Sequence, residues 1–348
     1  MAYTTINKSS LHFNTKLYTG NSTTDTAITG VGFQPDWLWV KSRGSAESHF
    51  LQDAVRGATK NLKSESSSNE ATDAQNIKSF DSDGFTLGSN DGVNDSGFNY
   101  VAWNWKAGTG AGSSNTDGSI NTTSTSVNSA AGFSISTYTG YGGASTIGHG
   151  LGAVPKMIIV KKRSGASYDE SWYVYHEAIG NTHTLGLNSN GGSSDVVVWN
   201  DTTPTSSVFS VGNDSTNRSG NEFVAYCFAE KTGYSKFGSY TGNGSTDGPF
   251  IYTGFKPAWV MTKKTSGSGD WMIRDNRRFG YNGKWGDLYP NNTNAEGVSD
   301  SNTQSDLLSN GFKLRMSHSN HNENGGSYIY MAFGQSIVGS NNIPATAR

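Results

Sequence analysis

Three stretches of the chain repeat one short pattern, and no other feature constrains the possible fold as strongly. They read GFQPDWLWVK (32–41), GAVPKMIIVK (152–161) and GFKPAWVMTK (254–263). Each places a lysine six residues after a proline, with an apolar run between the two. A short apolar run that follows a proline and is bounded by polar loops is typical of a buried β-strand.

The surroundings of these stretches repeat as well. The tripeptide YTG precedes each one, and each repeat ends in YVAWNW (100–105), FVAYCF (223–228) or YIYMAF (328–333), which place an alanine in register. Landmarks that return in a fixed order indicate an internal repeat. We therefore predict three homologous modules at 17–106, 132–231 and 232–338. The remaining segments are predicted as an N-terminal arm (1–16), a Gly/Ser/Thr/Asn-rich linker (107–131) and a C-terminal tail (339–348).

Strand patterns dominate all three modules. FNYVAWNW (98–105) alternates large and small or polar residues, as expected of a strand with one buried face. Helical periodicity is nearly absent, because Gly57 interrupts the best candidate at 51–62. The 44 glycines, with many Ser, Thr and Asn residues, are typical of turns between strands. We predict an all-β chain of three tandem antiparallel β-sandwiches with jelly-roll or lectin-like topology.

The composition excludes several classes of protein. Among 348 residues the formal net charge is −2 and only 16% are charged, which does not fit a nucleic-acid-binding surface. The single cysteine, Cys227, lies in an alternating strand and is expected to be buried and unreactive. No charged-then-apolar leader and no run of 18 apolar residues occurs, so we expect neither a signal peptide nor a membrane span.

A polar cluster recurs in the central segments of the repeats. Its members are His49, Asp53, Arg56, His176, Asp275 and Arg278. A carboxylate followed three residues later by an arginine could hold a sugar hydroxyl or another carboxylate. We favour a structural ion pair that braces a loop, because no module supplies a repeated pair of acids of the kind that glycosidases need. A catalytic pair of acids that is not repeated, and that folding brings together, stays an open alternative.

No cofactor or metal site is expected. The segment MSHSNHNEN (316–324) contains His318, His321 and Glu323, which could bind zinc. A spacing of three places the two histidines on opposite faces of a strand, and no third ligand follows at a diagnostic spacing. We therefore predict no metal ion here.

The surplus of aromatic residues provides the remaining candidate site. Five tryptophans at repeated strand positions are expected in the core: Trp37, Trp39, Trp103, Trp105 and Trp259. Other aromatic residues lie in unrepeated, loop-like positions, where flat rings beside amides and hydroxyls suit stacking on sugars. These candidate ligand-binding residues are Tyr141, Tyr168, Trp199, Tyr281, Trp285 and Tyr289.

Several of these motifs resemble a known family. The segments GHGLGAVPKMIIVK, VYH, LGLNS, TPTSSVFSVG and FVAYCFAEKTGYSKFGSYTGNGS, most specifically over 131–263, are similar to an uncharacterised tandem-repeat β domain of marine tailed-bacteriophage proteins. The opening MAYTTINKSSLHFNTKLYTG also resembles the start of these proteins. In such genomes the family resembles virion structural or tail-fibre-like components, and it carries no known catalytic residues.

The resemblance implies a virion surface protein, and we expect it on a tail or capsid. We expect it to be non-enzymatic, because no module supplies a repeated pair of acids. Such a protein would be made in the host cytoplasm without a signal peptide, form homo-oligomers, and contact other virion proteins and host-surface glycans. It would need neither nucleic acid nor membrane insertion. Alternatives are a purely structural decoration or tail subunit, a carbohydrate-active hydrolase, and a cellular adhesin.

Overall fold

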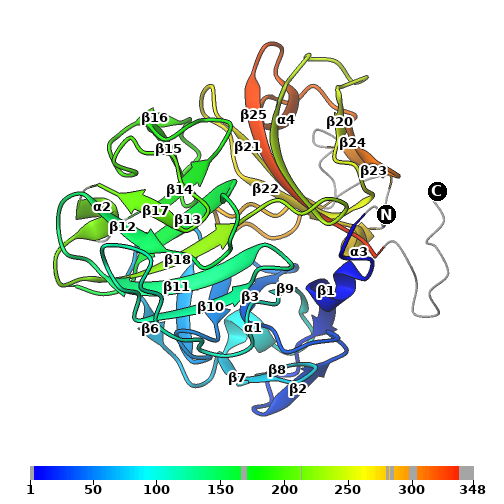
Figure 1. Ribbon diagram of the computed structural model, residues 1–348. Helices are drawn as coiled ribbons and strands as arrows, with labels where there is room; N and C mark the ends of the chain where they lie inside the picture. Colours follow the sequence, from blue (N-terminus) through cyan, green and yellow to red (C-terminus); the bar gives the residue numbers. More distant parts are fainter. Residues whose placement is uncertain are drawn as a thin grey trace.

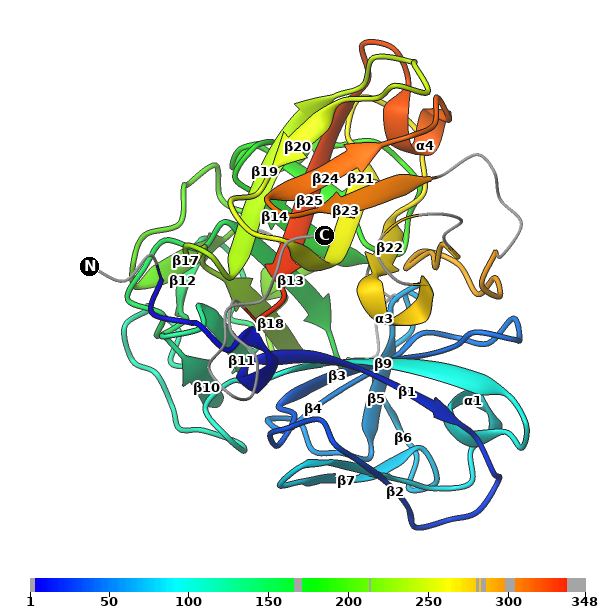
Figure 2. The ribbon, with the colours of Figure 1, turned by 90° about the vertical axis from the view of Figure 1, so that its right-hand side faces the viewer.

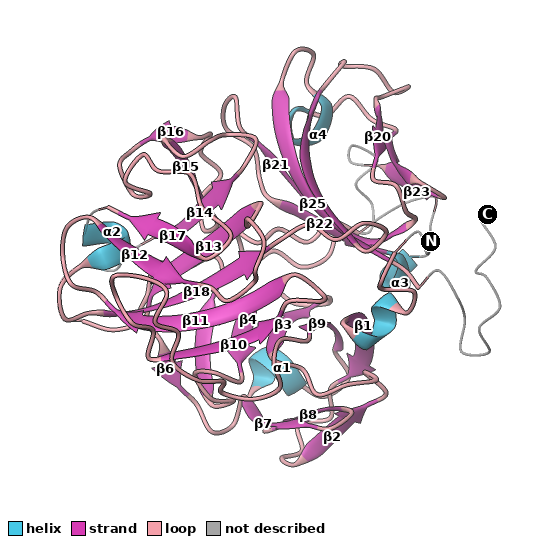
Figure 3. Ribbon diagram, in the orientation of Figure 1, coloured by secondary structure: helices cyan, strands magenta, loops and turns pink. Residues whose placement is uncertain are grey.

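The chain folds into β-sheets joined by loops and a few single-turn helices, as Figure 1 and Figure 3 show for this computed structural model. The structure describes residues 4–165, 171–212, 214–279, 282, 286–297 and 304–336. The prediction of an all-β fold is confirmed. The helices are η1 (Ser9–Leu11), α1 (Asp91–Asn94), α2 (Asp214–Asn217), α3 (Asn276–Phe279) and α4 (Ser319–Asn322). None of the helices in these ranges has the length and apolar character to cross a membrane.

Three large antiparallel sheets, which we call the inner sheets, form the centre of the molecule. The first contains β1 (Phe13–Thr19), β3 (Trp37–Ser42), β4 (Phe50–Asp53), β5 (Lys60–Lys63), β6 (Ala71–Thr72) and β9 (Asn99–Trp105). The second contains β10 (Ser124–Asn128), β11 (Phe133–Thr139), β13 (Met157–Lys162), β14 (Trp172–His176), β15 (His183–Gly186), β16 (Ser194–Asp195) and β18 (Glu222–Phe228). The third contains β19 (Ser235–Thr241), β21 (Pro257–Lys264), β22 (Met272–Asp275) and β25 (Ser327–Gly334).

The order of pairing is the same in each inner sheet. The strands pair as β1-β9-β3-β4, as β11-β18-β13-β14 and as β19-β25-β21-β22. In each sheet the strand that comes last in the sequence (β9, β18 or β25) thus lies between the strand that contains the start of the YTG repeat (β1, β11 or β19) and the strand that carries the Pro-to-Lys motif. We call the units that contain β1–β9, β10–β18 and β19–β25 modules 1, 2 and 3. Figure 1 shows them as blue-to-cyan, green and yellow-to-red groups of strands around a common centre.

A small sheet covers the outward face of each inner sheet. These outer sheets contain β2 (Thr26–Thr29), β8 (Gly84–Leu87) and β7 (Ile77–Asp81) in module 1, and β12 (Ser145–Gly148) and β17 (Val208–Val211) in module 2. Module 3 has β20 (Phe250–Tyr252), β24 (Gly311–Leu314) and β23 (Ser305–Leu308). Each module has its own apolar cluster between the two sheets, so each is a β-sandwich.

The inward faces of the three inner sheets meet in one apolar cluster, the shared core. Alternation along the strands produces both cores. In β3, Trp37 and Trp39 point into the shared core, while Leu38 and Val40 pack under the outer sheet of module 1. Because successive side chains of a strand point to opposite faces, such strands are buried on both sides, which explains their continuous apolar runs.

The prediction that the five tryptophans at strand positions are buried is confirmed, since none exposes more than 1% of its surface. All five belong to the shared core rather than to the interior of a single module. The Trp105 ring lies 4.6 Å from Trp37 of its own module and 5.5 Å from Trp259 of module 3, between ring centroids. These rings therefore join modules to one another.

The repeated YTG tripeptide locks each inner sheet to a single-turn helix. The hydroxyl groups of Tyr18, Tyr138 and Tyr240 donate to carbonyl groups of Val93 (2.7 Å), Thr216 (2.7 Å) and His321 (3.0 Å). The glycine of the motif has no room for a side chain: a Cβ on Gly20 would lie 2.2 Å from the carbonyl oxygen of Asp95, and the equivalent glycines are as crowded. The motif is thus a structural turn.

Two predicted boundaries differ from the structure. β1 begins at Phe13, inside the predicted N-terminal arm, and Phe13 packs in the shared core. The predicted linker 107–131 contains β10, which pairs along its whole length with β11. Its start is fixed by the buried carboxylate of Asp36, which accepts hydrogen bonds from the backbone N–H groups of residues 107, 109 and 110 at 2.7–3.0 Å. Composition suggests flexibility, but paired backbone groups hold this segment in place.

The shared core predicts that the three modules unfold together. Replacing Trp259 by Ala should lower the free energy of unfolding by about 3–5 kcal/mol and lower the midpoint of modules 1 and 2 by the same amount as that of module 3. Calorimetry should give one transition with equal calorimetric and van't Hoff enthalpies. Hydrogen exchange resolved by module would report the shift, and a loss confined to module 3 would contradict a common core.

Candidate functional site

The repeated polar residues lie where one module meets the next. Asp53, His176 and Asp275 end the equivalent strands β4, β14 and β22. All three are buried, with 1% or less of their surface exposed. We call the contact surface between two modules a seam, and each of these residues contacts the neighbouring module across a seam.

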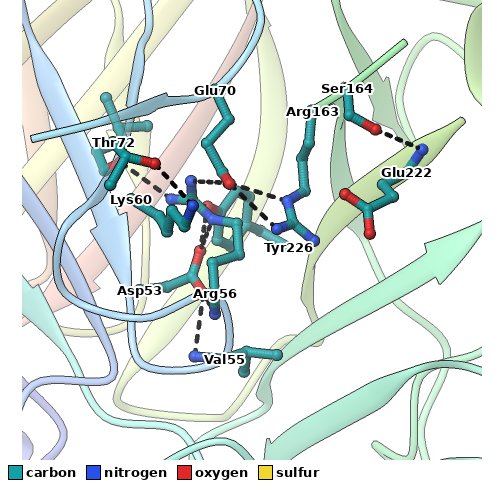
Figure 4. Close-up of polar contacts among 11 residues, drawn as sticks. Asp53, Val55, Arg56, Lys60, Glu70, Thr72, Arg163, Ser164, Glu222 and Tyr226 are labelled. Carbon is teal, nitrogen blue, oxygen red and sulfur yellow. Dashed lines mark hydrogen bonds and ion pairs between the residues drawn. The ribbon is translucent and has the colours of Figure 1, made fainter.

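At the seam between modules 1 and 2, a network of ion pairs surrounds Arg56 (Figure 4). Its guanidinium pairs with Asp53 at 2.5 Å and with Glu70 at 2.9 Å. From module 2, the Tyr226 hydroxyl donates to Asp53 at 2.7 Å, and Arg163 pairs with Glu70 at 2.9 Å. Each carboxylate therefore binds one group from its own module and one from the next.

The seam between modules 1 and 3 has the same arrangement in different residues. Arg278 pairs with Asp275 and with Glu296, both at 2.6 Å. From module 1, Trp103 Nε1 donates to Asp275 at 3.0 Å, and Arg43 pairs with Glu296 at 2.8 Å. Trp103 thus occupies the role that Tyr226 has at the first seam.

Among the described residues, the seam between modules 2 and 3 has no counterpart of the ion pairs found at the other two seams. His176 Nε2 lies 3.2 Å from the carbonyl oxygen of Tyr330 in module 3, and His176 Nδ1 accepts from the backbone N–H of Ala178 at 3.1 Å. Asp53 and Asp275 also accept from the backbone N–H two residues later. The His176 imidazole therefore keeps the hydrogen bond to the backbone two residues later. Across the seam it contacts a carbonyl group, where Asp53 and Asp275 take part in ion-pair networks.

Backbone hydrogen bonds close all three seams in the same way. The N–H groups of Glu70, Glu296 and Ser193 donate to the carbonyl groups of Arg163, Arg43 and Thr265 at 2.9, 3.0 and 3.0 Å. Buried tryptophans add to two of the seams: Trp172 Nε1 donates to the carbonyl of Lys63 at 2.9 Å, and Trp271 Nε1 donates to that of Gly186 at 2.8 Å. The modules therefore form a closed ring.

The lysine of the Pro-to-Lys motif is buried beside these contacts. Lys161 Nζ donates to the Ser67 carbonyl of module 1 at 2.6 Å, and Lys263 Nζ donates to the Asn190 and Gly191 carbonyls of module 2 at 3.2 and 2.7 Å. Burial lowers the pKa of Lys263 to about 7 and that of Lys41 to about 8. Lys161 and Lys263 therefore serve the seams, whereas Lys41 Nζ donates to the Ser42 and Ser45 carbonyls of its own module at 2.8 and 3.1 Å.

The charges of the cluster are neutralised within it. Burial alone would lower the pKa of Arg56, but Asp53, Tyr226 and Glu70 together outweigh this effect and the pKa is raised. Burial would raise the pKa of Glu70, but its bonds to Arg163 and Arg56 hold it below the usual value. Buried carboxylates that are paired with arginines are poorly suited to general acid–base catalysis, which needs access to substrate. The interpretation as structural ion pairs fits this geometry.

Sequence reasoning missed half of the charged residues in these two networks. Glu70 and Glu296 follow their arginines at different distances, 14 and 18 residues, so no common spacing marks them. Arg43 and Arg163 carried a usable signal, because each stands two residues after a repeated lysine. The paired acids are therefore repeated in two modules, in a place that no fixed motif reveals.

The loop aromatics have different fates. Tyr141 is 79% exposed, and Tyr289 is half-buried. The prediction that Trp199 is available to a ligand is wrong: it is 2% exposed and packs edge-on against Tyr175 beneath the outer sheet of module 2. Tyr168, Tyr281 and Trp285 lie outside the described residues.

Two further aromatic residues, Phe250 (44% exposed) and Tyr252 (61% exposed), lie on β20 and were not singled out from the sequence. Each flanks the buried Ile251. A strand that alternates exposed aromatic and buried aliphatic residues would have been a usable signal.

The histidines of segment 316–324 have structural contacts. His318 caps α4 by accepting from the backbone N–H of Asn320, and the buried His321 lies 2.7 Å from Arg274 Nη1 through its Nε2 atom. Within the described ranges no group of three or more His, Cys, Asp or Glu side chains is placed to hold a metal ion. Cys227 is buried, and burial raises the pKa of its thiol far above the usual range.

Replacing Asp275 by Asn should test the seam between modules 1 and 3. The amide would present an N–H group to the N–H groups of Arg278 and Trp103, and would leave Arg278 with Glu296 alone. We expect the free energy of unfolding to fall by about 3–5 kcal/mol, as for other buried pairs that lose one partner. Urea titration measures it.

The matched control is Glu177→Gln, which breaks the exposed pair with Lys156. This change should cost less than about 1 kcal/mol. Equal losses in the two variants would mean that the seam network contributes nothing special.

The pH dependence of stability should include a contribution from His176. Burial lowers the pKa of His176 to about 4, from 6.5 in the unfolded chain. The folded state therefore binds fewer protons between these values, and stability falls as the pH drops from 6.5 to 4. His176→Asn keeps an acceptor for Ala178 and should reduce that loss by up to about 3 kcal/mol.

Urea unfolding of both proteins at pH 7.5, 6 and 5 measures the effect. All other titrating groups are common to the two proteins, so the difference between their curves isolates position 176. Parallel curves would show that this imidazole is as easily protonated in the folded chain as in the unfolded one.

A family model places the chain among known sequences. It matches residues 8–336, which include all three modules, and its description reads domain of unknown function, DUF7483. No curated protein and no solved structure matches the chain. Because the match covers nearly the whole sequence, this three-module ring of β-sandwiches is a member of the DUF7483 family.

Proposed function

We propose that this chain is a non-enzymatic component of the surface of a tailed-bacteriophage particle, where it mediates particle assembly and attachment to host-surface glycans. The resemblance of residues 131–263 to repeat domains of tailed-phage proteins supports the virion assignment. A closed ring of three rigid sandwiches suits a displayed scaffold, since its outer loops keep fixed positions relative to one another.

One observation carries the non-enzymatic part of the proposal. The polar residues that the repeats have in common are used in the seams, where Asp53, Arg56, Asp275 and Arg278 are buried and paired. A hydrolase needs a carboxylate that a substrate can reach. These groups face one another rather than solvent, which supports a binding and assembly role over catalysis.

The tips of the modules support attachment at one place rather than three. The residue after the YTG turn is Asn21 in module 1, Tyr141 in module 2 and Asn243 in module 3. The backbone N–H group of each of the three donates to the side-chain oxygen of an equivalent asparagine, so the turns themselves are alike. At this turn position, which the structure describes in all three modules, only module 2 has an exposed ring for stacking on a sugar, and we assign Tyr141 to glycan contact.

Immunogold labelling of intact particles with an antibody against the chain tests the proposal. We expect gold on every particle of a phage that encodes the chain. Label at the tail tip or fibres would support the host-attachment role, and label spread evenly over the head would support the assembly role alone. The control is a particle preparation lacking the chain. Absence of label from particles that contain all other structural proteins would contradict the virion assignment.

A further inference from the structure

The chain already holds one extended segment of its own on the edge of an outer sheet. In module 2, Ile120 forms a parallel bridge with Ile147 of β12, and its N–H donates to the Thr146 carbonyl at 3.1 Å. The backbone N–H of Ser119 donates to the Thr146 hydroxyl, and that of Thr146 to the Ser119 hydroxyl, both at 2.8 Å. This edge therefore accepts an uncharged polypeptide strand.

The equivalent edge in module 3 is β20. Ile251 of β20 pairs with Phe312 as Ile147 pairs with Phe209, and β20 ends the order β20-β24-β23. In the part of the chain that the structure describes, no segment pairs with the other edge of β20. Figure 2 shows this sheet on the side of the molecule that faces the viewer.

The side chains of β20 distinguish it from the third equivalent edge. In module 1, the positions on either side of the buried Ile28 are Ala27 and Thr29. In module 3 the corresponding positions are Phe250 and Tyr252, which are 44% and 61% exposed. Large exposed aromatic residues on an unpaired edge favour association with another strand, whereas small and polar residues discourage it.

The neighbouring charges favour an uncharged partner. Phe250 pairs with Lys313, and Lys313 with Asp306, so these side chains share the solvent face of the sheet. Lys313 is paired with Asp247 at 2.9 Å, and Asp306 with Arg315 at 2.5 Å. Because these charges already have partners of opposite sign, a charged segment would gain little from them.

We propose that β20 binds an extended, uncharged, Ser/Thr-rich segment of a second polypeptide by strand addition. The segment lies parallel to β20, as residues 118–122 lie on β12, and its backbone pairs with the free edge. Phe250 and Tyr252 pack on its alternate side chains, which are within reach of cross-strand neighbours. The inference rests on the proposed function in one respect, which is that the second polypeptide is a neighbouring virion protein.

The test uses the full ¹⁵N-labelled chain and a synthetic peptide of residues 118–126, GSINTTSTS, acetylated and amidated at its ends. We expect amide shifts that saturate with peptide and concentrate at residues 250–252 and on β24. The variant Phe250→Ala/Tyr252→Thr, which carries the residues of module 1, should bind about tenfold more weakly. Because both side chains are exposed, its unfolding midpoint should match that of the parent protein.

A second peptide with an N-methyl group on its isoleucine separates strand addition from simple stacking on aromatic rings. It should lose binding, since it cannot donate the central hydrogen bond. Equal binding of the two peptides, equal binding by the double variant, or shifts confined to β12 would each overturn the proposal. Failure here would leave an immunogold result on particles unchanged, so the two proposals can fail separately.

Discussion

The shared core is the constraint on which the rest of the structure depends. Each inner sheet has two apolar faces, and its own outer sheet covers only one of them. The uncovered face carries large rings such as Trp37 and Trp259, whose burial contributes most of the apolar area per residue. Three sandwiches that meet face to face bury these rings in one cluster, so the ring of modules closes because each needs the others.

Closing such a ring brings polar backbone groups at the strand ends into contact, and the seams satisfy them. Two seams use a buried arginine between two carboxylates, and the third uses His176 against a carbonyl oxygen. The pairs Arg163–Glu70 and Arg43–Glu296 cross the two charged seams. An exchange of modules would remove these contacts, and breaking a buried ion pair is costly. The differences between the seams therefore fix the order of the modules around the ring.

The sequence predicts the all-β fold and the buried tryptophans, because alternation along a strand reports local geometry. It does not report which face of a strand meets another module. The lysines of the Pro-to-Lys motif illustrate this, since Lys161 and Lys263 bind carbonyl groups of another module. Glu70 and Glu296 were missed because the segments that connect them to Arg56 and Arg278 differ in length, so no common spacing marks them. The prediction for Trp199 was wrong because a loop without regular secondary structure can also pack on a core and bury its side chains.

Residues that differ between the modules are the ones not required for the cores or the seams of the ring. The three outer sheets share a buried isoleucine on their first strand, yet their edges differ. β12 is covered by the chain itself, β2 has the small residues Ala27 and Thr29 beside its isoleucine, and β20 exposes two aromatic residues. Since the repeated positions are committed to seams and cores, substitutions there affect stability in all modules at once. Selection for a new partner can act without that cost at positions such as Phe250, Tyr252 and Tyr141, which are the exposed aromatic residues in the described part of the chain.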